Sequence, residues 1–187
     1  MKTYLCIDIE ATCHDRELLG RDQTIHDMET IDLGVVAVDP DGNELSTFQS
    51  LIKPRYTELT DYCTDITGIT SAQLSGAPTL PEVMGDLARW LATLPAKPNC
   101  LYSWGKFDAK QLTFDTGSER WHIDLPLPEH HNAKKLFQKR HIKKGKQVGL
   151  MKALELVGLE FKGRHHSALD DARNVARLLR YFTSDQA

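Results

Sequence analysis

The feature that most constrains the fold is a pair of acids inside an apolar segment. Residues 3–9 read TYLCIDI, which predicts a β-strand, and Asp8 and Glu10 lie two positions apart at its end. Side chains at that spacing leave a strand on the same face. Two like charges on a buried face repel and lose hydration, at a cost of several kcal/mol unless a cation intervenes. The segment is therefore either a central strand that binds metal or an edge strand with a solvated acidic face.

The remaining pattern predicts an α/β protein. Strands are expected at 3–9, 30–38 and 44–52, joined as an antiparallel meander, and a further strand at 98–104. A capping-box spacing at 79–82 precedes a helix with apolar residues at helical intervals up to residue 94. Short helical turns are expected over 57–78, and helices at 107–116, 132–142, 149–157 and 168–182. Strands followed by helices that alternate with a strand predict a mixed sheet covered by helices.

Length and composition fit one domain. The chain has 187 residues, of which 41% are hydrophobic and 26% charged, and this excludes disorder, collagen and coiled coil. No stretch of about 18 apolar residues occurs, so no membrane span is expected. The four cysteines form no C-x-x-C pair, which argues against a zinc or disulfide framework. We therefore expect reduced thiols and a cytoplasmic protein.

Charge is distributed unevenly along the chain. The net charge is −3, yet residues 134–152, here called the basic segment, hold eight lysine and arginine residues and no acid. A basic stripe on a mildly acidic protein suits a polyanion whose backbone lies along one face. The alternative interpretation is a solvated helix face.

The segment 163–174 ends in two acids that a helical wheel separates. Asp171 shares its face with the apolar residues of the predicted helix, whereas Asp170 falls among arginines and an asparagine. His165 precedes Asp170 by five residues, and His166 precedes Asp171 by the same five, so the spacing alone favours neither pair. The wheel favours His166 and Asp171.

Together these residues indicate one site for hard cations. Asp108 follows the strand at 98–104, where sites form in α/β sheets, although an acid at a helix start is also a common N-cap. Asp8, Glu10, Asp108 and Asp171 offer oxygen ligands of the kind that Mg²⁺ and Mn²⁺ prefer. Two such ions suit in-line attack of water on a phosphodiester, and His166 is placed to accept the proton.

These motifs resemble those of the DEDDh 3′→5′ exonucleases of the DnaQ-like superfamily, and in particular the Eri-type exoribonucleases. The matching stretches are 8–13 (DIEATC), the run at 59–63 leading to 67–70, and 163–176, and the likeness extends from about residue 4 to 182. The resemblance implies an RNase H-like fold, with a five-stranded mixed sheet flanked by helices, as a single exonuclease domain over 1–187. The fifth strand is then expected near 120–130, with 121–125 (WHIDL) as the candidate.

The resemblance also implies roles for particular residues. Asp8, Glu10 and Asp171 would hold one metal ion, Asp8 and Asp108 would hold a second, and His166 would be the general base. Contacts to the 3′-terminal nucleotide are implied for a further set, which is Glu10, Ala11, Thr12, Thr67, Ile69, Phe107 and His166.

The function expected from the sequence is metal-dependent 3′→5′ hydrolysis of nucleic acid to nucleoside 5′-monophosphates. Single-stranded RNA or a short 3′ overhang is the expected substrate, and two Mg²⁺ or Mn²⁺ ions the expected cofactors. One alternative is a 3′→5′ exodeoxyribonuclease acting on DNA. Another, from a different class, is a nucleic-acid-binding module with little activity.

Overall fold

The molecule is built on one five-stranded mixed sheet. A computed structural model describes residues 2–124, 126–142 and 145–183. The strands β1 (Tyr4–Ala11), β2 (Thr30–Val38), β3 (Glu44–Leu51), β4 (Leu101–Ser103) and β5 (His130–Asn132) lie in the order β3-β2-β1-β4-β5. The first three are antiparallel, β4 is parallel to β1, and β5 is parallel to β4. The predicted meander and the five-stranded mixed sheet of an RNase H-like fold are confirmed.

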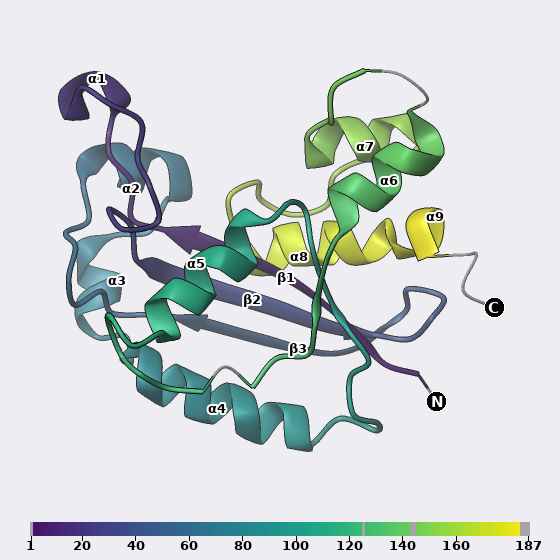
Figure 1. Cartoon of the computed structure of the whole chain (residues 1–187), viewed down its shortest axis with the longest axis horizontal. Coiled ribbons are helices and arrows are strands. Elements are labelled where there is room, and N and C mark those ends of the chain that lie inside the picture. The colour runs from purple at the N-terminus through teal and green to yellow at the C-terminus, as the bar shows by residue number, and fades with distance from the viewer. Residues whose placement is uncertain (1, 125, 143–144, 184–187) are drawn as a thin grey trace.

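Helices cover both faces of the sheet and one end of it (Figure 1). α4 (Leu80–Ala92) begins at a capping box between Thr79 and Glu82, as predicted. None of the helices in the described residues is long and apolar enough to cross a bilayer. The other helices are α1 (Arg16–Leu19), α2 (Asp61–Thr67), α3 (Ser71–Ser75), α5 (Phe107–Thr116), α6 (Ala133–His141), α7 (Leu150–Leu156), α8 (Ala168–Arg177) and α9 (Leu179–Thr183).

The alternation of side chains along β1 divides the core in two. Leu5, Ile7 and Ile9 are buried against α4 and α5 on one face. Cys6 lies on the other face, within the cluster formed by α6, α7, α8 and α9. Asp8 and Glu10 have the same parity as Cys6, so β1 directs both acids toward the face that α8 covers.

Two sequence-based expectations are wrong. The fifth strand is β5 at His130–Asn132, and not the segment 121–125, whose residue 125 lies outside the described residues. Trp121 and Ile123 instead pack as loop residues against the core cluster under α4, which explains their alternating apolar pattern. The helix expected over 168–182 is divided at Leu178, where two tight turns, Leu178 N–H to Val175 O and Tyr181 N–H to Leu178 O, separate α8 from α9.

Candidate active site

Three carboxylates from two elements meet at the end of the sheet. β1 supplies Asp8 and Glu10, and α8 supplies Asp171. One oxygen of each lies within 4.8 Å of the others, in a cluster in which Glu10 and Asp171 are buried and Asp8 is partly exposed. The structure therefore brings together three of the four acids that the sequence singled out.

A glycine allows α8 to reach this position. Gly34 of β2 pairs with Asp8 across the sheet, and a Cβ atom at Gly34 would overlap the backbone of Ala168 and Leu169. The first turn of α8 therefore rests directly on the strand, with no side chain between them. This close approach holds Asp171 beside β1.

The two acids of α8 point in different directions, as the helical wheel predicted. Asp171 is 6% exposed and accepts a hydrogen bond from the His166 backbone N–H at 2.8 Å. Asp170 accepts from the Arg164 N–H at 2.9 Å and lies 3.7 Å from Arg173. Only Asp171 belongs to the carboxylate cluster among the described residues.

Both histidines of the motif flank the cluster. His166 Nδ1 is 4.0 Å from Glu10 Oε2, and His165 Nε2 is 4.0 Å from Asp171 Oδ1. Their rings are in edge contact, with centroids 4.0 Å apart. His166 adopts φ of 61°, a left-handed conformation that costs roughly 1–3 kcal/mol in a residue other than glycine and that clusters at functional sites.

Asp108 lies at the edge of β1, beyond the point where β4 ends. Its Oδ1 accepts a hydrogen bond from the Ile9 N–H at 3.3 Å. Asp108 is not a member of the three-acid cluster, but its charge is the second cause, after burial, of the raised pKa of Asp8.

Burial and mutual repulsion raise the pKa values of the acids in the site. The pKa of Asp8 is raised well above its ordinary value, and burial with the Asp171 charge raises the pKa of Glu10 to about 8. Burial also raises the pKa of Asp108 and of Asp171. Burial and the neighbouring His165 lower the pKa of His166, which favours a neutral imidazole at neutral pH.

The donor set fits a hard divalent cation. Carboxylate oxygens from separate elements converge within a space that one ion can bridge. Burial first, and then the neighbouring acids, raise the pKa of Asp8 and Glu10, and a bound cation would oppose both effects. Cations of this type prefer oxygen ligands over the thiolate and imidazole that zinc prefers.

Sequence reasoning missed one acid beside this cluster. Asp32 is buried and pairs with Glu10 across the β1–β2 ladder. Its carboxylate accepts from the Ala168 N–H and from Gln49, both at about 3.3 Å, and so caps the start of α8, where Ser167 makes no side-chain cap. The signal was available, because Asp32 interrupts the apolar run at 30–38 as Asp8 interrupts its own.

The residues implied to contact substrate differ in accessibility. Phe107 is 41% exposed, whereas Thr12, Thr67 and Ile69 are buried. The Thr12 hydroxyl accepts from the Glu29 N–H and contacts Thr57, so its hydrogen-bonding capacity is already used within the protein. The Thr67 hydroxyl is also engaged within the protein, because it donates to the Cys63 carbonyl.

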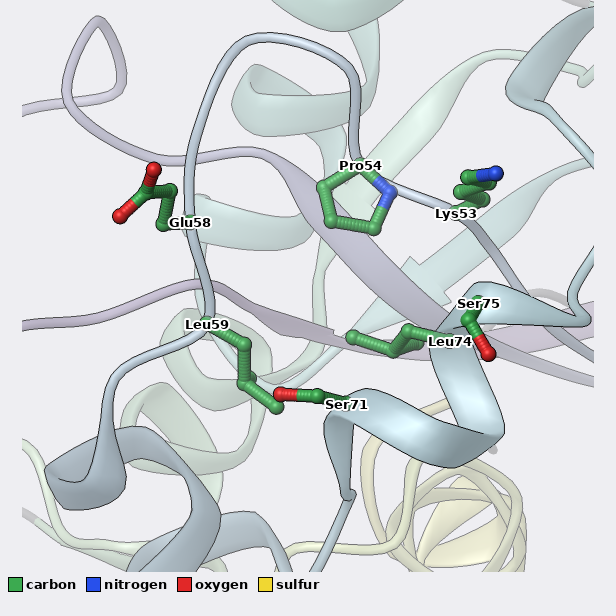
Figure 2. Close-up of a pocket in the computed structure, with 7 residues that line it drawn as sticks. All are labelled: Lys53, Pro54, Glu58, Leu59, Ser71, Leu74 and Ser75. Atoms are coloured by element: carbon green, nitrogen blue, oxygen red, sulfur yellow. The ribbon is translucent and has the colours of Figure 1, made fainter.

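A separate cavity of about 350 Å³ lies between the 53–59 loop and α3 (Figure 2). Leu59 and Leu74 approach each other across it, while Lys53 and Glu58 stand at opposite rims. None of the four predicted metal-binding acids lines this cavity, so it is distinct from the carboxylate cluster.

Comparisons with known proteins place the chain in a family. Residues 5–179 match the family described as Exonuclease. The chain is 32% identical to ERI1 exoribonuclease 2 of Danio rerio, over 97% of this chain and 35% of that protein. It is 30% identical to human 3'-5' exoribonuclease 1, over 94% of this chain and 51% of that protein. The chain thus spans about half or less of the length of these curated relatives.

A solved structure extends the comparison to the fold. The nuclease domain of 3'hExo, described as a DEDDh family member bound to rAMP, matches with a TM-score of 0.82 at 28% identity, over 98% of this chain and 93% of that one. The chain therefore belongs to the exonuclease family, as a DEDDh-type member that resembles the ERI1 exoribonucleases.

Proposed function

We propose that this chain is a metal-dependent 3′→5′ exoribonuclease that releases nucleoside 5′-monophosphates. The observation that carries the proposal is the meeting of Asp8, Glu10 and Asp171 within 4.8 Å, with His166 at 4.0 Å from Glu10. Together with Asp108, these residues supply the four acids and the histidine after which DEDDh enzymes are named. We also propose that residues 1–187 are one exonuclease domain and that the protein is cytoplasmic; the free thiols of its four cysteines support the latter.

Two ions are proposed for the site. Asp8, Glu10 and Asp171 would hold the first, while Asp8 and Asp108 would hold the second, because Asp108 is close enough to perturb Asp8. When bound, Mg²⁺ or Mn²⁺ would polarise the phosphate and lower the pKa of the attacking water.

His166 is proposed as the general base. A neutral imidazole can accept the proton from water at its unprotonated ring nitrogen, and the lowered pKa of His166 favours the neutral form at pH 7. Water then adds to phosphorus as the bond to the upstream O3′ breaks. The products are a nucleoside 5′-monophosphate and a strand with a new 3′-hydroxyl.

RNA is proposed as the substrate because the matched relatives are named exoribonucleases and the matched nuclease domain holds rAMP. The exposed Phe107 beside Asp108 would stack on the terminal base, with Ile69 and Thr67 nearby. Glu10, Ala11 and Thr12 would lie against the terminal sugar, although the Thr12 hydroxyl and the Thr12 N–H are both hydrogen-bonded to the Glu29 backbone.

Digestion of end-labelled oligomers tests the proposal. With Mn²⁺ or Mg²⁺, a 5′-labelled single-stranded RNA should shorten one nucleotide at a time, while a 3′-labelled RNA should release its label at once as a mononucleotide. Faster digestion of the matching DNA would favour the exodeoxyribonuclease alternative. Binding of RNA without any hydrolysis in either metal would favour the binding module.

A further inference from the structure

A second feature lies beside Asp108 and outside the carboxylate cluster. An open groove of about 690 Å³ runs between the outward face of α5 and the start of α6. Its polar lining includes Lys106, Lys110, His130, His131, Asn132 and Lys135, and none of the described residues that line it is acidic. On a chain with net charge −3, such a groove is a local concentration of positive charge.

The lysines of this groove are arranged to act together. Lys106 and Lys110 are exposed and lie one helical turn apart, about 6 Å along α5. Lys135 faces them from α6 and is the member of the basic segment that lines the groove. Within the described part of the chain, none of these three ammonium groups lies within 4 Å of a carboxylate, whereas Lys152 is paired with Glu155.

The groove lies next to the candidate active site. His130 Nε2 is 2.9 Å from the hydroxyl of Ser103, the last residue of β4, which lies five residues before Asp108. Lys106 also immediately precedes Phe107 and Asp108 at the start of α5. A strand whose terminal nucleotide lies at Phe107 and Asp108 therefore has the groove as its neighbour.

We propose that this groove binds the backbone phosphates of the RNA strand on the 5′ side of the nucleotide being removed. The inference rests on the proposed exonuclease function, since it takes the position of the 3′ end from that site. The three lysine ammonium groups along the open groove can each bind one of several successive phosphates. Such contacts do not distinguish one base from another.

The test compares substrate lengths. The variant Lys106→Gln/Lys110→Gln/Lys135→Gln is measured against a control of equal charge change, Lys53→Gln/Lys97→Gln/Lys162→Gln, whose lysines line other cavities. The measured quantity is kcat/KM for a 12-nucleotide RNA divided by kcat/KM for a dinucleotide, which has no phosphate upstream of the scissile one. The groove variant should lower this ratio at least 10-fold and reduce the salt slope of 12-mer binding by about 2, at about 0.7 per lost contact.

The control variant should have the same ratio of kcat/KM values, 12-mer to dinucleotide, as the unmodified protein. Equal ratios in groove and control variants would overturn the proposal, as would an equal loss on dinucleotide and 12-mer, which would place the lysines at the reacting nucleotide. Should the unmodified protein hydrolyse neither substrate, the proposed function fails separately. Fluorescence anisotropy with a 5′-labelled 12-mer RNA then tests the groove proposal on its own. The proposal requires that the groove variant bind the 12-mer more weakly than the control variant does.

Discussion

Glu10→Gln is expected to stabilise the metal-free protein at pH 8. The substitution keeps the size and shape of the side chain while it removes one charge from the buried cluster of Asp8, Glu10 and Asp171. Without metal, that charge is opposed by burial and by its neighbours, which raise the pKa of Glu10 from 4.5 to about 8. An amide carries no such cost.

The magnitude follows from the two pKa values. The folded protein holds the Glu10 proton more tightly than the unfolded chain does, so the unmodified protein loses stability as the pH rises from about 4.5 to about 8. At about 1.4 kcal/mol for each tenfold difference in proton affinity, the upper limit at pH 8 is roughly 4 kcal/mol. Because protonation of one acid lowers the repulsion felt by its neighbours, we expect the variant to gain about 2 kcal/mol at pH 8 and less than about 1 kcal/mol at pH 5.

Urea unfolding in EDTA at pH 5 and pH 8 measures these gains, with the exposed Glu160→Gln as the matched control. Millimolar Mn²⁺ should reverse the order at pH 8, because it stabilises a site with all its carboxylates more than a site that lacks one. An equal gain at both pH values, or no gain at pH 8, would refute the repulsion argument. A gain in the Glu160 control would do the same.

Three further predictions concern the last motif, the packing of α8 and the basic segment. Asp171→Asn and His166→Ala should each lower RNA turnover by roughly 100-fold or more, whereas Asp170→Asn and His165→Ala should stay within a few-fold; equal losses would contradict the assignment. Gly34→Ala should cost about 1–3 kcal/mol and weaken the Mn²⁺-induced rise in melting temperature, because the added Cβ displaces α8; an unchanged metal response would count against this packing argument. Changing Lys139, Arg140, Lys143, Lys144 and Lys146 of the basic segment to Ala should weaken RNA binding and flatten its salt dependence, while turnover at saturating substrate survives. Residues 143 and 144 lie outside the described residues, and an unchanged slope would indicate a solvated helix face.

The sequence was sufficient to predict the position of a residue wherever its pattern could arise in only one way. Asp8 and Glu10 could be assigned to one face because strand geometry leaves no other choice, and Asp171 could be separated from Asp170 because a helix has only one core-facing side. The α5 boundaries matched because a glycine on each side limits the helix.

The sequence was insufficient where pairing partners decide the structure. β5 is three half-buried polar residues, His130–Asn132, and becomes a strand only through its pairing with β4. The loop at Trp121 and Ile123 alternates like a strand because the sheet face above it is apolar. Asp32 shows the same limit, since its role depends on the distant start of α8.

The dispersed origin of the acids has a consequence for how the protein is made. Asp8 and Asp108 are in place on the sheet and α5, but the cluster is completed only when α8 docks against β1 and β2. At about 5–20 residues per second, a ribosome needs roughly 3–13 s to extend a chain from residue 108 to residue 171. During that interval the nascent sheet lacks its third carboxylate and its histidine. The metal-binding cluster is therefore completed only after α8 has been synthesised and has docked on the sheet.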